Sequence, residues 1–158
     1  MLVGLISDTH GLMREQALAT LQGSDLIIHA GDVGDYAIID RLSAVGPVVA
    51  VRGNVDRGEC AQRLPESAVA EAGPVSIYVL HDIQQLDLNP AAAGFHIVVS
   101  GHSHKHGRNE RGGVLYLNPG SAGPRRFRLP VTVARLDLRS LPWSVDFIDL
   151  LAGDSQPG

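Results

Sequence analysis

Two apolar runs constrain the fold most, because each ends abruptly in side chains that are costly to bury. The chain begins MLVGLISDTH, and residues 98–106 read VVSGHSHKH. Carboxylate and imidazole groups at the end of a hydrophobic strand need a compensating partner, since an unpaired charge is unfavourable in an apolar setting. The pattern therefore predicts buried strands whose polar ends belong to a functional site.

Strands and helices are predicted to alternate over the first third of the chain. Apolar runs predict strands at 2–7, 25–30 and 47–52, and amphipathic patterns predict helices at 12–22 and 35–45. This order is typical of parallel strands joined by crossover helices.

The rest of the chain is predicted to be richer in strands. The expected elements are a hairpin over 67–80, a short helix over 83–93, a buried strand at 95–100, and half-exposed antiparallel strands at 112–120, 130–138 and 143–150. About eight strands with only about three helices is too many strands for a simple doubly wound fold. Two packed sheets with helices outside are therefore expected. Residues 1–150 are predicted to be a single domain, and 151–158 a flexible C-terminal tail.

Composition excludes several classes of protein. The 158 residues carry a net charge of -4, so no dedicated nucleic-acid-binding surface is expected. Cys60 is the single cysteine, which excludes an internal disulfide. The N-terminus does not read as a signal peptide, and no run approaches the roughly 20 apolar residues that span a bilayer. A soluble cytoplasmic protein with no membrane association is expected.

Polar side chains follow five of the predicted strands, at the carboxyl ends where α/β sheets bind ligands. Residues two positions apart in an extended chain face the same side, so both side chains of a D-x-H or H-x-H pair can bind the same ligand. Mixed carboxylate, amide and imidazole ligands suit borderline divalent ions, and a carboxylate shared by two ions about 4 Å apart would use them all. The candidate ligands are Asp8, His10, Asp32, Asn54, His81, His102 and His104. Singly, the Asp-x-His, Gly-Asp and Gly-Asn motifs are more typical of turns or helix caps than of metal sites. His102 and His104 alone are as typical of a solvated loop, and His81 alone indicates nothing special.

The ordered set D-x-H, GD, GN-x-D, H and GH-x-H resembles the calcineurin-like metallophosphoesterases, and most of all their small bacterial and archaeal phosphodiesterase branch. The resemblance covers residues 1–150 and implies the metallophosphoesterase-type fold, an α/β fold in which a two-sheet β-sandwich is flanked by helices in four α/β/β/α layers. It also implies two divalent metal ions, with manganese favoured and iron, nickel or zinc as alternatives. The implied ligands are Asp8, His10, Asp32 and His104 for the first ion, and Asp32, Asn54, His81 and His102 for the second, with Asp32 as the bridge.

The implied activity is hydrolysis of a phosphate ester, expected to be a phosphodiester, by a metal-bridging hydroxide that attacks phosphorus. Asp32 and Asn54 are the expected catalytic residues. Many family phosphatases carry a histidine, a candidate general acid, where this chain has Val55, and His106 is the candidate replacement. Asp82 stands where this branch often has glycine, and its carboxylate would either repel an anionic substrate or point away.

Other residues are expected to support this site. Ser121 and Arg125, in the loop NPGSAGPRR, are candidate substrate contacts, although an ordinary Pro-Gly turn is an equal interpretation. Residues next to the metal ligands are expected to orient them by hydrogen bonds, and the candidates are His29, Asp35 and Asp56. The alternative for His29 is a buried structural histidine, and the alternative for Asp35 is a helix cap.

Two other functions compete with this prediction. A protein-interaction scaffold on the same fold, as in the retromer complex, is expected to have lost metal ligands, and none is lost here. A metallo-β-lactamase-type hydrolase carries a compact H-x-H-x-D-H signature, which this chain lacks. The sequence leaves the substrate open, and also whether the chain forms a homo-oligomer.

Overall fold

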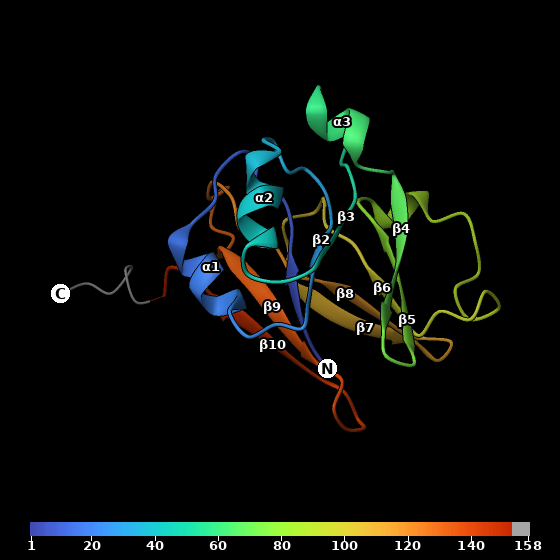
Figure 1. Cartoon of the computed structure of the whole chain (residues 1–158). Coiled ribbons are helices and arrows are strands. Elements are labelled where there is room, and N and C mark those ends of the chain that lie inside the picture. The colour runs from blue at the N-terminus through green and yellow to red at the C-terminus, as the bar shows by residue number, and fades with distance from the viewer. Residues whose placement is uncertain (153–158) are drawn as a thin grey trace.

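The computed structural model describes residues 1–152, which form two five-stranded sheets packed face to face (Figure 1). The first sheet has the order β10-β9-β1-β2-β3, with three parallel strands in sequence and two antiparallel strands added at one edge. Its strands are β1 (Leu2–Ile6), β2 (Leu26–His29), β3 (Val48–Ala50), β9 (Thr132–Asp137) and β10 (Ser144–Asp149).

The second sheet has the order β4-β5-β6-β8-β7. The hairpin β4–β5 is confirmed, and β5, β6 and β8 run parallel to one another. The antiparallel strand expected at 112–120 is confirmed in part, because β8 pairs antiparallel with β7 but parallel with β6. The strands are β4 (Ser67–Ala72), β5 (Val75–Leu80), β6 (Ile97–Val99), β7 (Gly107–Arg111) and β8 (Val114–Asn118).

The main core lies between the two sheets, and a second cluster lies under the helices. In β1, Val3 and Leu5 point into the core between the sheets, whereas Ile6 points to the helix-covered face. Successive side chains of a strand alternate between the faces of its sheet. Both faces of β1 are covered, which explains why its sequence is continuously apolar.

Helices α1 (Glu15–Leu21) and α2 (Ala37–Ser43) cover the outer face of the first sheet (Figure 1). Each places apolar side chains against that sheet, with Leu21 and Leu42 fully buried. Both helices are as predicted but shorter at their ends. A third helix, α3 (Glu59–Arg63), stands at the upper end of the molecule in Figure 1 and was not predicted.

The helix predicted over 83–93 was wrong. Only the 3-10 turn η1 (Ile83–Gln85) forms there, and together with Leu86 it packs against the outer face of the second sheet. Pro90 explains the difference, since proline disfavours helical backbone at the preceding residue and cannot donate its own hydrogen bond in a helix. The outer faces of the two sheets are thus covered unequally.

The two-sheet sandwich with flanking helices is confirmed. Strand β7 was not predicted because its sequence, GRNER, has no apolar residue, and its pairing with β8 holds it at the sheet edge. Of the predicted tail over 151–158, Leu151 packs beside the helix-covered cluster, and residues 153–158 lie outside the described residues. The division into one domain and a tail stays a prediction.

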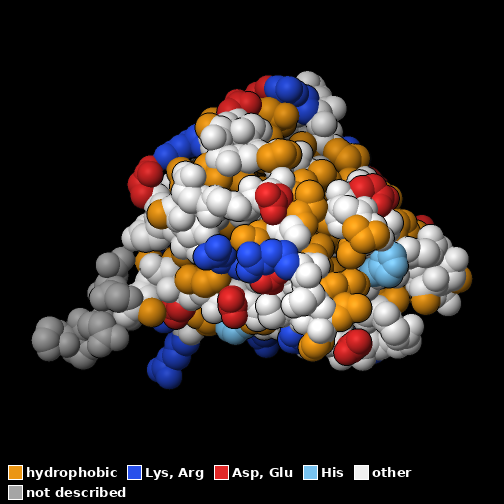
Figure 2. Space-filling model, turned by 60° about the horizontal axis from the view of Figure 1, so that its bottom comes forward, with side chains coloured by type: hydrophobic (Ala, Val, Ile, Leu, Met, Phe, Trp, Pro, Cys, Tyr) orange, Lys and Arg blue, Asp and Glu red, His pale blue; other side chains and the backbone are white. Residues whose placement is uncertain are grey.

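The face at the lower end of Figure 1 mixes side chains of all kinds. Figure 2 shows hydrophobic side chains interspersed with acidic and basic ones, around a short row of Lys and Arg. Within residues 1–152, no helix is long and apolar enough to span a membrane.

Candidate metal centre

The predicted ligands all follow the carboxyl ends of parallel strands. Asp8 and His10 come after β1, Asp32 after β2, and Asn54 after β3 of the first sheet. The second sheet contributes His81 directly after β5, and His102 and His104 after β6. Because parallel strands end at the same edge of a sheet, and the two sheets pack face to face, these loops meet at one end of the sandwich.

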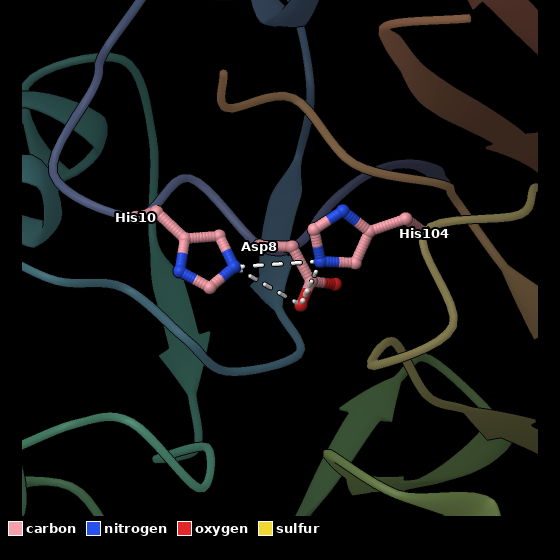
Figure 3. A group of neighbouring side chains, drawn as sticks. All are labelled: Asp8, His10 and His104. Carbon is pink, nitrogen blue, oxygen red and sulfur yellow. Dashed lines mark hydrogen bonds and ion pairs between the residues drawn. The ribbon is translucent and has the colours of Figure 1, made fainter. Parts of the chain in front are cut away.

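One group of potential ligand atoms consists of Asp8, His10 and His104. Figure 3 shows the two imidazole rings on either side of the Asp8 carboxylate, with a nitrogen of each ring pointing toward it. The His104 Nε2 and His10 Nε2 atoms lie 3.4 Å and 3.8 Å from Asp8 Oδ1, and they lie 3.4 Å from each other. Asp8 and His104 are buried, so this group is largely shielded from water.

The second group consists of Asp32, His81 and His102. His81 Nε2 lies 3.1 Å from Asp32 Oδ2, and Asn54 joins through its Oδ1 atom, 3.2 Å from His102 Nδ1. Asp32 Oδ2 is also 3.7 Å from His10 Nε2 of the first group. One carboxylate oxygen therefore faces ligands of both groups, which is the position that a bridging carboxylate requires.

The backbone at these positions is unusual. Of the six non-glycine residues with positive φ in the described chain, five are candidate ligands: Asp8, His10, Asp32, His102 and His104. Such conformations cost about 1–3 kcal/mol each and persist only where surrounding structure enforces them. The loops thus hold their side chains in directions that unstrained turns would not give.

Two glycines allow the loops to approach each other. A Cβ atom on Gly53 would overlap the Asp32 carboxylate and backbone nitrogen, and one on Gly101 would overlap Ser7 Oγ. The glycines before Asn54 and His102 are therefore required by close packing, not by the freedom of a turn. Any larger residue would push apart the loops that carry the two groups.

The protonation states of the cluster follow from burial and from neighbouring charges. Burial raises the pKa of Asp8, whereas for Asp32 the effect of burial is outweighed by the adjacent His81 ring and by the hydrogen bond from the Val55 N–H, which lower its pKa. Burial also opposes a charge on His81, but the two carboxylates raise its pKa. Burial lowers the pKa of His104.

Unsatisfied buried atoms show that the cluster fits divalent cations. His81 Nδ1 lies 2.8 Å from the Ala30 carbonyl, to which it can only donate, so the lone pair of a neutral ring lies on Nε2. That Nε2 atom and Asp8 Oδ1 are both buried without a hydrogen-bond partner, 3.8 Å apart. A lone pair facing carboxylate oxygens is repulsive unless a cation lies between them, and nitrogen with oxygen donors suits Mn, Fe, Ni or Zn.

His29 is a neutral, buried residue behind the cluster. Its Nδ1 atom accepts from the Gly31 N–H at 3.1 Å, so Nε2 carries the proton and donates to Thr9 Oγ1 at 3.0 Å. Thr9 Oγ1 then donates to the Val33 carbonyl at 2.8 Å. Burial lowers the pKa of His29 to about 4. This chain of bonds joins the loop after β1 to the loop after β2.

Asp56 joins the loop after β2 to the loop after β3. Its buried carboxylate accepts three backbone N–H groups, from Gly53 at 2.8 Å, Gly34 at 2.9 Å and Val33 at 3.1 Å. Asp35, by contrast, is exposed and accepts the Ala37 N–H at the start of α2. Asp35 precedes Tyr36, the N-cap of α2, and both interpretations of Asp35 stay predictions.

Two supporting residues were missed by sequence reasoning. Ser7 Oγ donates to Asp8 Oδ2 at 2.7 Å, which leaves Oδ1 for the centre of the cluster. Asn118 Nδ2 donates to the Gly101 carbonyl at 2.9 Å and so holds the loop that carries His102 and His104. The NPGS segment was a signal for Asn118, whereas nothing in the sequence distinguished Ser7.

The remaining candidates do not belong to the two groups of potential ligand atoms. Ser121 is buried, and its hydroxyl donates to the Asp8 carbonyl at 3.1 Å, whereas Arg125 is exposed. The His106 ring packs on Phe147 with 5.0 Å between ring centroids. Val55 contributes its backbone N–H to Asp32 Oδ1 at 3.0 Å. Direct roles for Ser121, Arg125 and His106 in catalysis or binding stay predictions.

Comparison with known proteins finds one family over almost the whole chain. The calcineurin-like phosphoesterase superfamily domain matches residues 1–141. A protein described as a probable metallophosphoesterase, from Methanocaldococcus jannaschii, is 35% identical over 154 residues, which cover 89% of this chain and 73% of that protein.

Two solved structures share the fold. An archaeal protein described as a phosphodiesterase has a TM-score of 0.78 at 22% identity, covering 94% of this chain and 100% of its own. Vps29 from Entamoeba histolytica, solved with zinc, has a TM-score of 0.72 at 22% identity, covering 95% of this chain and 99% of its own.

Proposed function

The chain belongs to the calcineurin-like phosphoesterase superfamily, and we propose that it hydrolyses phosphodiesters with two divalent metal ions. The observation that supports two ions is the pair of ligand groups, Asp8–His10–His104 and Asp32–His81–His102, with buried atoms in each that lack a partner. Manganese is the proposed metal, with iron, nickel or zinc as alternatives. When bound, such ions lower the pKa of water and neutralise charge on the phosphate.

The proposed roles of the ligands follow from their contacts. Asp32 would help to hold both ions, because its Oδ2 atom faces both His10 and His81, while its Oδ1 atom accepts the Val55 N–H. Asn54 completes the second group and lines the cavity beside it, so its amide is available to orient the phosphate. The strained loops keep these groups aligned before substrate arrives, which is how preorganised sites lower a barrier.

Water is the proposed nucleophile. The nearest hydroxyls are committed to other bonds, since Ser7 Oγ donates to Asp8 Oδ2 and Ser121 Oγ donates to the Asp8 carbonyl. In the reaction, one water adds to phosphorus and one P–O ester bond breaks, which gives a phosphomonoester and an alcohol. A group transfer through a covalent serine ester is not part of this proposal.

The proton donor to the leaving alcohol is proposed to be His106, in the absence of a histidine at position 55. General acid catalysis contributes about 10²–10⁴-fold for poor leaving groups and little for 4-nitrophenolate. His106→Ala should therefore slow an alkyl diester far more than a 4-nitrophenyl diester. Equal losses on both substrates would assign His106 only to packing on Phe147.

Charge around the site favours diesters over monoesters. A diester carries one negative charge and a monoester nearly two, and the cavity beside the second ligand group is lined by Asp82 and Asp87. Extra negative charge on the substrate is therefore disfavoured there. Arg125, exposed on the loop after β8, is the proposed basic contact for the phosphate.

Metal removal and restoration test this function. Protein stripped with a chelator should be inactive, and manganese should restore hydrolysis of bis(4-nitrophenyl) phosphate well above that of 4-nitrophenyl phosphate. A correctly folded protein that is inactive with manganese, iron, nickel and zinc would favour the alternative, an interaction scaffold on this fold. That alternative is raised by the likeness to Vps29.

A further inference from the structure

A cavity of about 400 Å³ lies against the second ligand group. Asn54 and His81 form part of its wall, so a group attached to a phosphate held at the metal centre would enter it directly. Volumes of about 300–1,000 Å³ are typical of pockets for small organic groups. The rest of the wall includes Tyr78, Asp82 and Asp87, which is an acidic and aromatic lining beside a site for an anion.

The one arginine among the residues that line the cavity, Arg52, is already paired. The Arg52 guanidinium donates to the carbonyls of Ala61 and Leu64, at 3.2 Å and 3.0 Å, and to Glu66 Oε1 at 2.9 Å. These bonds hold Arg52 and Glu66 against the end of α3, where their charges cancel. Of the other two carboxylates of the lining, Asp82 Oδ2 lies 3.8 Å from His102 Nε2, whereas Asp87 has no ion-pair partner among residues 1–152.

Three side chains of the lining could recognise a cation. Asp82 Oδ1 accepts the Gln84 N–H at 3.0 Å, which fixes the carboxylate at the cavity wall. Asp87 is exposed and forms no ion pair with any residue of the described chain. The Tyr78 ring is held by Phe95, with 5.1 Å between ring centroids. Carboxylates attract an ammonium group, and an aromatic ring adds a cation–π contact.

We propose that this cavity binds the alcohol arm that stays on phosphorus, and that it selects an arm carrying an ammonium group. The inference rests on the proposed phosphodiesterase activity and names the class of substrate. A phosphodiester of an amino alcohol or quaternary-ammonium alcohol places its anionic phosphate at the metal centre and its cation between Asp87 and Tyr78. Arms that carry further phosphate groups are repelled by the same carboxylates.

Two substrates that differ in one atom test the selection. With manganese-loaded protein, 4-nitrophenyl phosphorylcholine is compared with 4-nitrophenyl 3,3-dimethylbutyl phosphate, in which carbon replaces the quaternary nitrogen. Both release 4-nitrophenolate, so the ratio of their kcat/KM values reports recognition of charge and not chemistry. We expect the choline ester to be roughly tenfold better, from two carboxylates and one ring.

Variants at residues that are not metal ligands test whether Asp87 causes the difference in kcat/KM between the two substrates. Asp87→Asn should lower the ratio to about threefold, and Asp87→Lys should bring it to one or below. Asp146→Asn, which removes an exposed carboxylate on β10, is the matched control and should leave the ratio unchanged. Asp82 is not used, because its Oδ2 atom lies 3.8 Å from His102 Nε2 and its loss would also disturb the ligand.

A binding measurement separates failure of this inference from failure of the proposed function. Equal kcat/KM values for the two substrates would overturn the inference and leave the phosphodiesterase proposal intact. If no diester is hydrolysed, amide chemical shifts during titration with choline decide. Shifts at Gln85 and Asp87 that 3,3-dimethylbutanol does not produce would support the cavity, and their absence would overturn it.

Competition identifies the source of the ammonium ester. Inhibition of the nitrophenyl assay by glycerophosphocholine, and not by micelles of lysophosphatidylcholine, would support a soluble diester. The reverse result would support a lipid headgroup. Inhibition by neither would count against the proposal.

Discussion

Replacing Asp56 with alanine should destabilise the metal-free protein by about 4 kcal/mol. The Asp56 side chain is 6% exposed, and its carboxylate accepts three backbone N–H groups at 2.8–3.1 Å. A hydrogen bond to a charged group contributes about 1.5–3 kcal/mol, and an N–H left unpaired in a buried place costs about 1–3 kcal/mol. Water can replace the carboxylate at the N–H of the exposed Gly34. The expected loss of unfolding free energy therefore comes mainly from the N–H groups of Val33 and Gly53.

Urea unfolding of chelator-treated protein measures this loss, and the melting temperature should fall by roughly 8–16 °C. Asp56→Asn keeps one acceptor oxygen and should lose about half as much. Asp35→Ala is the matched control, because it removes one exposed carboxylate with a single bond to the Ala37 N–H, and it should cost about 1 kcal/mol.

Asp56→Ala should also weaken metal binding by roughly 10–100-fold, since the residues it holds adjoin Asp32 and Asn54. Titration of the metal into both variants gives this ratio. Equal stability of Asp56→Ala and Asp35→Ala would refute this reasoning. It would mean that the three hydrogen bonds of the Asp56 carboxylate do not hold the loop after β2 to the loop after β3.

Three further predictions concern other residues. Asp32→Ala should abolish turnover and lower the metal bound per chain while the circular dichroism spectrum stays unchanged; full turnover would remove the bridging role. Burial lowers the pKa of His29 to about 4 in the folded protein, against an ordinary value of 6.5, so the stability from its neutral ring is complete above pH 6.5 and lost toward pH 4. His29→Gln should flatten that part of the stability profile, measured by urea midpoints, by up to about 3 kcal/mol. Cys60 is buried and its pKa is raised to about 11, so iodoacetamide at pH 8 should label it over roughly 100-fold more slowly in native than in unfolded protein.

Much of the fold and of the candidate site was predictable because strand ends carry a strong local signal. The buried strand β1 is continuously apolar, β2 is apolar up to His29, and a carboxylate, Asp8 or Asp32, follows each strand within three residues. Parallel strands bring their carboxyl ends to one edge, so residues as distant as Asp8 and His104 could be expected to meet. The structure places these two residues 3.4 Å apart, between Oδ1 and Nε2.

Other features had no local signal. Strand β7 forms because β8 offers it a partner, although no apolar residue marks it, and the segment 83–93 is diverted from a helix by Pro90. Two of the three bonds of Asp56 join segments more than 20 residues apart. Hydrogen bonds of that kind depend on how loops approach one another, which residue types alone do not specify.

The sequence by itself determined which atoms are available for the chemistry, their order along the chain and the strand ends that carry them. The family resemblance already implied how those atoms divide between two ions and that Asp32 is shared. Only the tertiary structure gives the distances within each group, because each group combines side chains from both sheets. It also decided the orientation of Asp82, whose carboxylate the sequence left free either to face the substrate or to point away. Its Oδ2 atom lies 3.8 Å from His102 Nε2, beside the second group. The physical reason is that close packing of loops at Gly53 and Gly101, with positive φ at five of the ligands, sets side-chain directions that a local pattern cannot encode.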